Sequence, residues 1–170
     1  MAYSLPIEDM GNTWIEHSMV INNFVIKIGS QLKSKLCRVF GESVQYQWLE
    51  NDNKIVCPDA SILCDLRHRR NVSFTGAPRF VMEVLSHATE LYDRNEKMQL
   101  YCKVGVSEYW IVNWREKTVE IYLFDGNADG SLYSYLYKTV TEENKEELQL
   151  VTFPHLSITF DELFNLEVED

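Results

Sequence analysis

The sequence lacks any apolar run near the ~20 residues that a membrane-spanning helix needs, and it lacks an excess of positive charge. Its 16 lysines and arginines are outnumbered by 26 aspartates and glutamates, which gives a formal net charge of −10. This balance disfavours broad attraction to nucleic acids or anionic membranes, although a local basic site is still compatible with it. The first ten residues lack a basic stretch followed by an apolar one, so we expect no signal peptide and no membrane partner.

Cysteine is sparse, and none of the four cysteines stands in a CxxC motif. With no signal peptide expected, this pattern favours a cytoplasmic protein whose thiols are reduced. We therefore predict that the cysteines are small buried side chains and form no disulfide. The four residues are Cys37, Cys57, Cys64 and Cys102.

The chain also lacks internal repeats, low-complexity tracts and any linker that would divide two domains. With 170 residues and a hydrophobic share of 45%, it is long enough and apolar enough to bury one substantial core. We predict a single domain over residues 1–170, with its core at about 13–165.

The segment from Gly76 to Asn113 has the pattern of a strand, a helix and a second strand. Residues 80–85 form a short apolar run, typical of a buried strand, that contains a single acid, Glu83. A polar amphipathic helix is expected at about 89–103, with Gly105 as its C-cap, followed by a strand at 106–113. This order is typical of a parallel crossover unit.

The remaining patterns add two helices and several strands around this unit. Thr13 and Glu16 have capping-box spacing, and apolar residues at helical spacing predict a helix from 13 to about 36. A second capping box at Thr159 and Glu162 predicts a short C-terminal helix. A loop is predicted at 66–75, a hairpin connection at 125–130, and strands at 37–49, 55–66, 117–124, 132–140 and 148–153. Together these elements predict an α/β domain with a mixed central sheet flanked by helices.

Two carboxylates fall inside predicted strands, next to apolar residues: Asp59, directly after Pro58, and Glu83. Two acids on neighbouring strands repel each other unless a proton or a cation lies between them. Oxygen ligands of this kind suit Mg²⁺, which takes one or two carboxylates together with waters and substrate phosphate. The alternative is that one of these acids is a structural salt-bridge partner.

The predicted helix after Glu83 carries a lysine that could reach the acids. Asp93, Lys97 and Tyr101 are spaced i, i+4 and i+8, so they lie on one side of a helix. A helix packed on the sheet could aim Lys97 at the carboxylates, where its charge would position a water or stabilise a transition state. The alternative is an ordinary exposed Asp93–Lys97 pair, worth only ~0.3–0.5 kcal/mol.

Pro58-Asp59, Glu83-Val-Leu-Ser86 and Lys97, in this order, resemble the PD-(D/E)XK nuclease superfamily and, more closely, the Uma-two family of restriction endonucleases. The similarity runs from about His17 to Phe164. It is also carried by Gly76-Ala-Pro78, Asp93, Tyr101, Gly105–Val112, Phe153–Ile158 and Leu163-Phe164.

The resemblance implies a restriction-endonuclease-like fold and hydrolysis of DNA with Mg²⁺ or Mn²⁺. It makes Asp59 and Glu83 metal ligands and Lys97 the catalytic lysine. Leu85 stands where the superfamily has a lysine two residues after the strand acid, but in the similar family the lysine comes from the following helix, as Lys97 would. His17 matches a histidine early in the first helix of that family and could orient water or a ligand; alternatively, it is a partly exposed helix residue.

One basic cluster and several aromatic residues leave alternatives open. Residues 67–70 contain three arginines and a histidine, which either contact phosphate or form a solvated loop with partners such as Asp65. We expect the aromatic side chains to belong to the core and to interfaces rather than to a base-stacking surface, and a tyrosine-rich outer strand would suit a homodimer. These aromatic residues are Tyr109, Trp110, Tyr133, Tyr135 and Tyr137.

Three hypotheses for function follow from these patterns. The leading one is a metal-dependent endonuclease in which Asp59 and Glu83 hold Mg²⁺, Lys97 stabilises the reacting charge and His17 assists. A rival is a non-catalytic protein of nuclease fold that binds nucleic acid or a protein partner, which the net charge of −10 favours. In a third, the acid pair is purely structural in an assembly component.

Overall fold

The computed structural model describes residues 14–33 and 35–167, and its centre is a six-stranded mixed sheet. Its strands β7 and β8 are parallel, and every other neighbouring pair is antiparallel. The predicted α/β architecture with a mixed central sheet is therefore confirmed. In spatial order the strands are β1 (Arg38–Gly41), β4 (Ala60–Leu63), β7 (Phe80–Val84), β8 (Glu108–Asn113), β9 (Thr118–Gly126) and β10 (Leu132–Val140).

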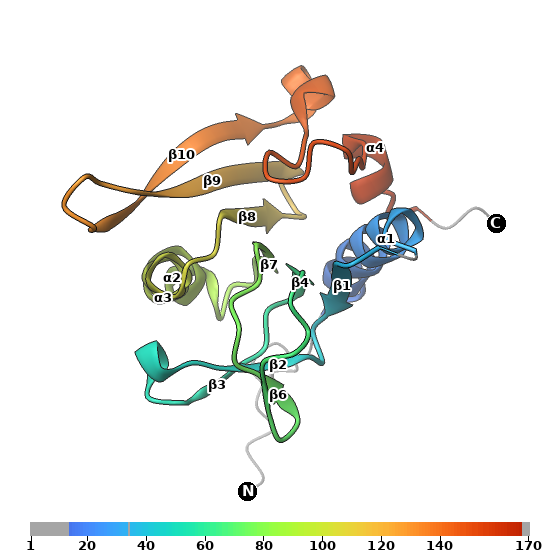
Figure 1. Ribbon diagram of the computed structural model, residues 1–170. Coiled ribbons are helices and arrows are strands. Elements are labelled where there is room, and N and C mark those ends of the chain that lie inside the picture. Colours follow the sequence, from blue (N-terminus) through green and yellow to red (C-terminus); the bar gives the residue numbers. More distant parts are fainter. Residues whose placement is uncertain (1–13, 34, 168–170) are drawn as a thin grey trace, which may run out of the picture.

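Helices cover both faces of this sheet, as Figure 1 shows. On one face lie α1 (Ile15–Gln31) and the short α4 (Phe160–Leu163), and the crossover between β7 and β8 lies on the other. The crossover consists of α2 (Glu90–Tyr92), a π-helical turn labelled η3 (Asp93–Lys97), and α3 (Met98–Val104). Gly105 ends it with a φ of 93°, which confirms the predicted C-cap.

The alternation of side chains along β7 divides the core into two clusters. Met82 and Val84 pack beneath α1 with residues such as Phe24, whereas Val81 and Leu85 pack beneath α3. Because successive strand residues point to opposite faces, Glu83 faces the α3 side together with Val81 and Leu85. The strand that carries the acid is therefore enclosed by apolar side chains on both faces.

A second, four-stranded sheet was not predicted. It has the order β3-β2-β6-β5 and is built from β3 (Ile55–Val56), β2 (Gln45–Gln47), β6 (Ser73–Phe74) and β5 (Arg69–Arg70). The single predicted strands at 37–49 and 55–66 are wrong, because each is divided between the two sheets; η2 (Leu49–Asn51) follows β2. Pro58 cannot donate to a strand ladder, and the second division falls at this residue, directly before Asp59.

The strand predicted at 148–153 is also wrong. The backbone N–H groups of Val151 and Thr152 donate to the carboxylate of Glu108, at 3.0 and 2.7 Å, in place of a neighbouring strand. This segment follows the 3₁₀ helix η4 (Glu142–Glu147) and still buries Leu150 in the core. The capping box at Thr159 is confirmed, whereas α1 ends at Gln31 rather than near 36 and Thr13 lies outside the described residues.

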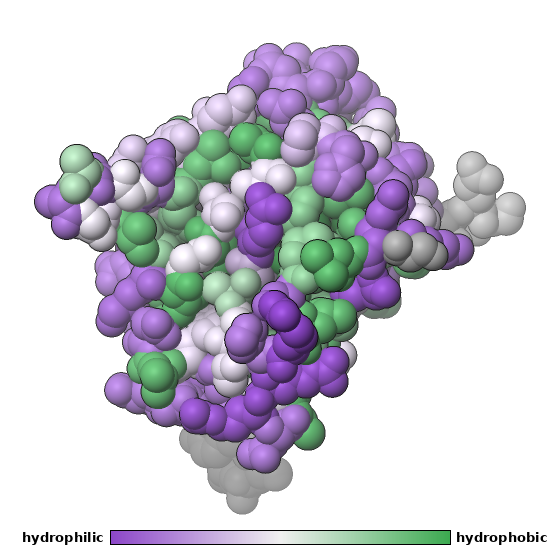
Figure 2. All heavy atoms as spheres, in the orientation of Figure 1, coloured by the Kyte–Doolittle hydropathy of each residue, from purple (hydrophilic) through white to green (hydrophobic). Residues whose placement is uncertain are grey.

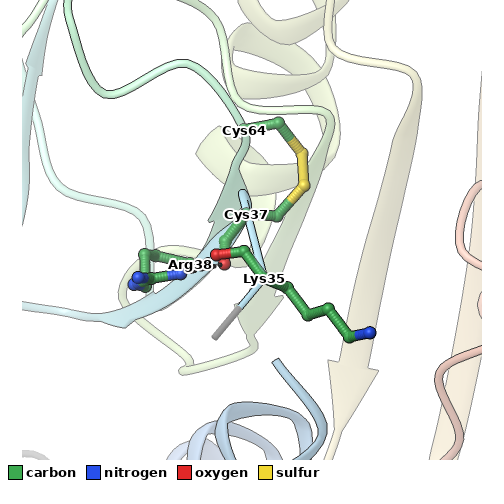
Figure 3. Close-up of a disulfide and its surroundings, with 4 residues drawn as sticks. All are labelled: Lys35, Cys37, Arg38 and Cys64. Atoms are coloured by element: carbon green, nitrogen blue, oxygen red, sulfur yellow. Dashed lines mark hydrogen bonds between the residues drawn. A yellow bond between two sulfur atoms is a disulfide. The ribbon is translucent and has the colours of Figure 1, made fainter. Parts of the chain in front are cut away.

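The prediction of four reduced thiols is wrong, because Cys37 and Cys64 form a disulfide (Figure 3). The antiparallel register pairs Arg38 in β1 with Leu63 in β4, so the cysteines just outside these partners face each other. They are 27 residues apart in sequence, and strand pairing brings them together. Cys57 and Cys102 are free, and Cys57 is exposed rather than buried. In the described part of the chain, no helix is long and apolar enough to cross a membrane.

Candidate active site

Asp59 and Glu83 meet where β4 begins and β7 ends. Reciprocal hydrogen bonds fix them: the Asp59 N–H donates to Glu83 Oε2 at 3.4 Å, and Asp59 Oδ2 accepts the Val84 N–H at 2.7 Å. The antiparallel register of the two strands, in which Ala60 is opposite Met82, produces this contact. The sheet therefore brings together the two acids that the sequence singled out.

Lys97 reaches this acid pair from the crossover helix. Its Nζ lies 2.9 Å from Glu83 Oε2 and 2.9 Å from Asp93 Oδ1. The side chain of Lys97 is only 13% exposed, and those of Glu83 and Asp93 are each 1% exposed. The alternative of an ordinary exposed Asp93–Lys97 pair is therefore wrong: this is a buried network of two acids and one lysine.

The π-helical turn keeps the network on one side of the helix. In a regular α-helix, Asp93 and Tyr101 would be rotated by about 80° from each other, since eight residues at 3.6 per turn overshoot two full turns. The wider π turn at 93–97 offsets this rotation, and Tyr109 anchors it by donating its hydroxyl to the Asp93 carbonyl at 3.0 Å. Tyr101 then reaches the site as well, and its hydroxyl donates to Glu83 Oε1 at 2.6 Å.

Burial and the neighbouring Asp59 raise the pKa of Glu83 from 4.5 to about 8, against the opposing effect of the Lys97 charge. Burial alone would lower the pKa of Lys97, but the charges of Glu83 and Asp93 outweigh it and raise that pKa, so the ammonium stays protonated. Lys97 is thus paired with two of the three acids, Glu83 and Asp93.

His17 approaches Asp59 from α1, which lies on the face of the sheet opposite the crossover helix. Its Nε2 lies 3.4 Å from Asp59 Oδ2, and its side chain is 11% exposed, so it is not a partly exposed helix residue. Burial lowers the pKa of His17, but the hydrogen bond and charge of Asp59 more than compensate and raise it above its ordinary value. The structure therefore places all four residues singled out from the sequence in one cluster.

The donor set at this cluster fits a magnesium or manganese ion. Asp59 and Glu83 supply hard oxygen ligands, and a divalent cation would relieve the repulsion that raises the Glu83 pKa. Within residues 14–33 and 35–167, no group of three or more histidines, cysteines and acids is arranged to hold a metal. An ion here would have two protein carboxylates and would complete its shell with waters and substrate oxygens, as Mg²⁺ commonly does.

Sequence patterns missed the groups that hold Asp93 in place. Thr89 Oγ1 donates to Asp93 Oδ2 at 2.8 Å and lies 2.9 Å from Ser86 Oγ. The i, i+4 spacing of Thr89 and Asp93 was a visible signal, but it gains meaning only once Asp93 is known to be buried. In the basic cluster, Arg67 belongs to a solvated surface, as the second alternative expected: its side chain is 85% exposed, and its guanidinium pairs with Asp65 at 2.8 Å.

Comparison with known proteins places this chain in a family. The chain matches, over residues 6–161, the model of the Uma2 family, described as "Putative restriction endonuclease". It is 33% identical over 122 residues to the uncharacterized protein slr1290 of Synechocystis sp. PCC 6803; this stretch covers 71% of the chain but only 63% of that relative, less than two thirds of its length.

A solved structure has a fold similar to that of this chain. The crystal structure described as a putative nuclease belonging to DUF820, from Anabaena variabilis ATCC 29413, has a TM-score of 0.66 and 19% sequence identity to this chain. The match covers 90% of this chain and 82% of that one, and it shows a shared fold. With the family model matched over nearly the whole sequence, the chain belongs to the Uma2 family of restriction-endonuclease-like proteins.

Proposed function

We propose that this protein is a metal-dependent endonuclease that hydrolyses phosphodiester bonds in DNA. The observation that carries the proposal is the meeting of Asp59, Glu83 and Lys97 at the end of β7, with the lysine ion-paired inside the fold. Two hard carboxylate ligands at a buried site suit a divalent cation, and the cation in turn suits a phosphodiester. Membership of the Uma2 family supports nuclease chemistry.

In this proposal Asp59 and Glu83 hold Mg²⁺ or Mn²⁺. Such an ion, when bound, polarises a phosphodiester and lowers the pKa of a water molecule. His17 contacts Asp59 at 3.4 Å and orients its carboxylate, and Tyr101 holds the other oxygen of Glu83 at 2.6 Å. The two acids are thus fixed by partners on α1 and α3 before any ligand arrives.

Lys97 supplies a fixed positive charge next to the acids. Asp93 holds its ammonium at 2.9 Å, which keeps the long side chain in one position. A preorganised cation in a site that is largely shielded from water stabilises the negative charge that develops on a phosphodiester under attack. Asp93 is a positioning residue in this scheme because it acts through Lys97.

The test is a DNA cleavage assay with Mg²⁺ or Mn²⁺ and with EDTA, on the wild type and three single variants. Asp59→Asn, Glu83→Gln and Lys97→Met should each reduce the cleavage rate by about 10²-fold or more. Lys103→Met is the matched control, because Lys103 lies on the same crossover helix but is exposed. If a confirmed nuclease activity survives all three site substitutions, the assignment is wrong.

A second function, binding of nucleic acid or a protein partner without catalysis, is favoured by two observations. Lys97 is already paired with two carboxylates, and the whole chain carries a net charge of −10, which opposes DNA. Isothermal titration with Mn²⁺ separates the two functions. Uptake that Asp59→Asn abolishes supports the endonuclease, whereas no uptake with or without DNA supports the binding protein.

A further inference from the structure

Outside the acid cluster, two tryptophans and an arginine form a compact group. The rings of Trp14 and Trp114 have their centroids 6.2 Å apart, inclined by 44°. The guanidinium carbon of Arg115 lies 4.4 Å from the Trp114 ring centroid and 5.5 Å from that of Trp14. Both indoles therefore contact one cation, and Trp114 also packs against the apolar core.

Trp14 and Arg115 are exposed, Trp114 is half-buried, and the other two tryptophans of the chain are buried. Trp48 and Trp110 are 2% and 0% exposed, as large aromatic side chains in a core should be. Trp14, in contrast, is 48% exposed, and Arg115 is also exposed. Arg115 forms no ion pair with any residue that the structure describes, although the chain is rich in acids.

The group lies at the same end of the sheet as the acid cluster. Trp14 stands directly before α1, three residues and thus about one helical turn from His17, which contacts Asp59. Trp114 follows β8, two residues beyond Val112, the parallel partner of Val84 at the end of β7. Trp14 is therefore attached to the helix that carries His17, and Trp114 to the strand that pairs with β7, which carries Glu83.

We propose that Trp14, Trp114 and Arg115 form a binding site for an unpaired DNA base next to the site of cleavage. The inference rests on the proposed nuclease function and adds a substrate preference to it. A base stacks on the exposed face of Trp14, and the Arg115 charge attracts the adjoining phosphate. The protein then prefers DNA with a single-stranded stretch, a bulge or an extruded base over a fully paired duplex.

The chemistry of the group selects this ligand over others. Every base presents a π-face that stacks on an aromatic side chain, but in a duplex these faces are covered by neighbouring bases. Arginine held over an indole is positioned to add a cation–π contact and to meet phosphate. In a chain with a net charge of −10, such a local cation is needed to offset repulsion of the DNA backbone.

The test measures stacking without relying on cleavage. A single-stranded oligodeoxynucleotide carrying 2-aminopurine, whose fluorescence falls when it stacks, is titrated with protein in EDTA, in parallel with the same strand in a full duplex. We expect saturable quenching with the single strand and weaker binding to the duplex. Trp14→Ala should weaken single-strand binding roughly tenfold or more, and Trp14→Phe should restore part of it.

Ile15→Ala is the matched control, because Ile15 is the neighbouring residue and is 76% exposed but has no ring. Arg115→Gln should weaken binding and reduce its dependence on salt. Unchanged single-strand affinity in Trp14→Ala, with a thermal unfolding curve like that of the wild type, would overturn the base site even if the wild type cleaves DNA with Mg²⁺. Equal affinity of the wild type for both DNAs would overturn it too.

Discussion

Glu83 is enclosed by its neighbours, with a side chain that is 1% exposed, and this burial decides how it titrates. Its burial was predictable, because an acid inside a short apolar run of strand residues has no route to solvent. The burial of Asp93 was not predictable, since it depends on which side of the helix packs on the sheet and on the hydroxyl of Tyr109, which contacts the Asp93 backbone. Local pattern therefore identified the acids and the lysine, and tertiary packing decided that their ion pair is enclosed.

The protonation of Glu83 leads to a prediction about stability and pH. Burial and Asp59 raise its pKa from 4.5 to about 8 in the metal-free protein. Between these values the folded chain keeps a proton that the unfolded chain has released, so rising pH lowers the free energy of unfolding. We expect the wild type in EDTA to lose stability from pH 5 to pH 8 by at least about 1 kcal/mol more than Glu83→Gln, which cannot titrate at this position.

Urea unfolding at several pH values measures this difference. Glu120→Gln serves as a control, because the pairing of Glu120 with Arg94 lowers its pKa and its ionised form is stabilised in the fold. In that variant, the free energy of unfolding should still fall above pH 5 as steeply as in the wild type. Parallel pH profiles for the wild type and Glu83→Gln would show that Glu83 is already ionised in the folded chain.

Among the elements, the crossover helix combines what was predictable with what was not. Its position and its Gly105 end followed from amphipathic spacing and from the conformational freedom of glycine at a φ of 93°. The π turn at Asp93–Lys97 did not, because nothing in local spacing distinguishes it from a regular helix. The Glu108 contacts that replace a strand were likewise set by a residue far away in the sequence, whereas the break at Pro58 follows from the missing N–H of proline.

Removal of one residue from the π turn tests its role. Deletion of Asn95, which is exposed, should convert the turn to a regular α-helix and rotate Asp93 out of line with Lys97 and Tyr101. We expect helix content by circular dichroism to be retained while DNA cleavage falls by about 10²-fold, the same scale as loss of the lysine. Asn95→Ala is the control and should cleave like the wild type. Full activity in the deletion variant would show that the turn does not align the site.

For the whole molecule, the tyrosine-rich strand β10 was predicted, but its place at the edge of the six-stranded sheet came from the structure. Trp110 and Tyr109 are core residues as predicted, whereas the β10 tyrosines are exposed. In Figure 2, apolar surface gathers inward of the β9–β10 hairpin, within a largely hydrophilic rim. Five side chains on the strand are 40–51% exposed: Leu132, Tyr133, Tyr135, Leu136 and Tyr137.

An exposed edge strand with apolar side chains is suited to pairing with another strand. We propose that a second copy of the chain pairs with β10, so that light scattering gives twice the monomer mass of 19.9 kDa. A lysine on an edge strand opposes such pairing, so Tyr135→Lys should give the monomer mass. Ile26→Lys, at a 71% exposed position on α1, should leave the mass unchanged. A monomeric wild type at high protein concentration would contradict the dimer.

The most direct test of the proposed metal site is a crystal structure of the protein soaked in Mn²⁺, with anomalous density sought between Asp59 and Glu83. We predict a peak within about 2.0–2.3 Å of an oxygen from each carboxylate, with Lys97 Nζ still directed at the same position and held by Asp93. Glu83→Gln crystals treated in the same way should lack the peak. Absence of density in wild-type crystals at saturating Mn²⁺, with Lys97 paired to both acids as before, would contradict a metal-dependent nuclease site.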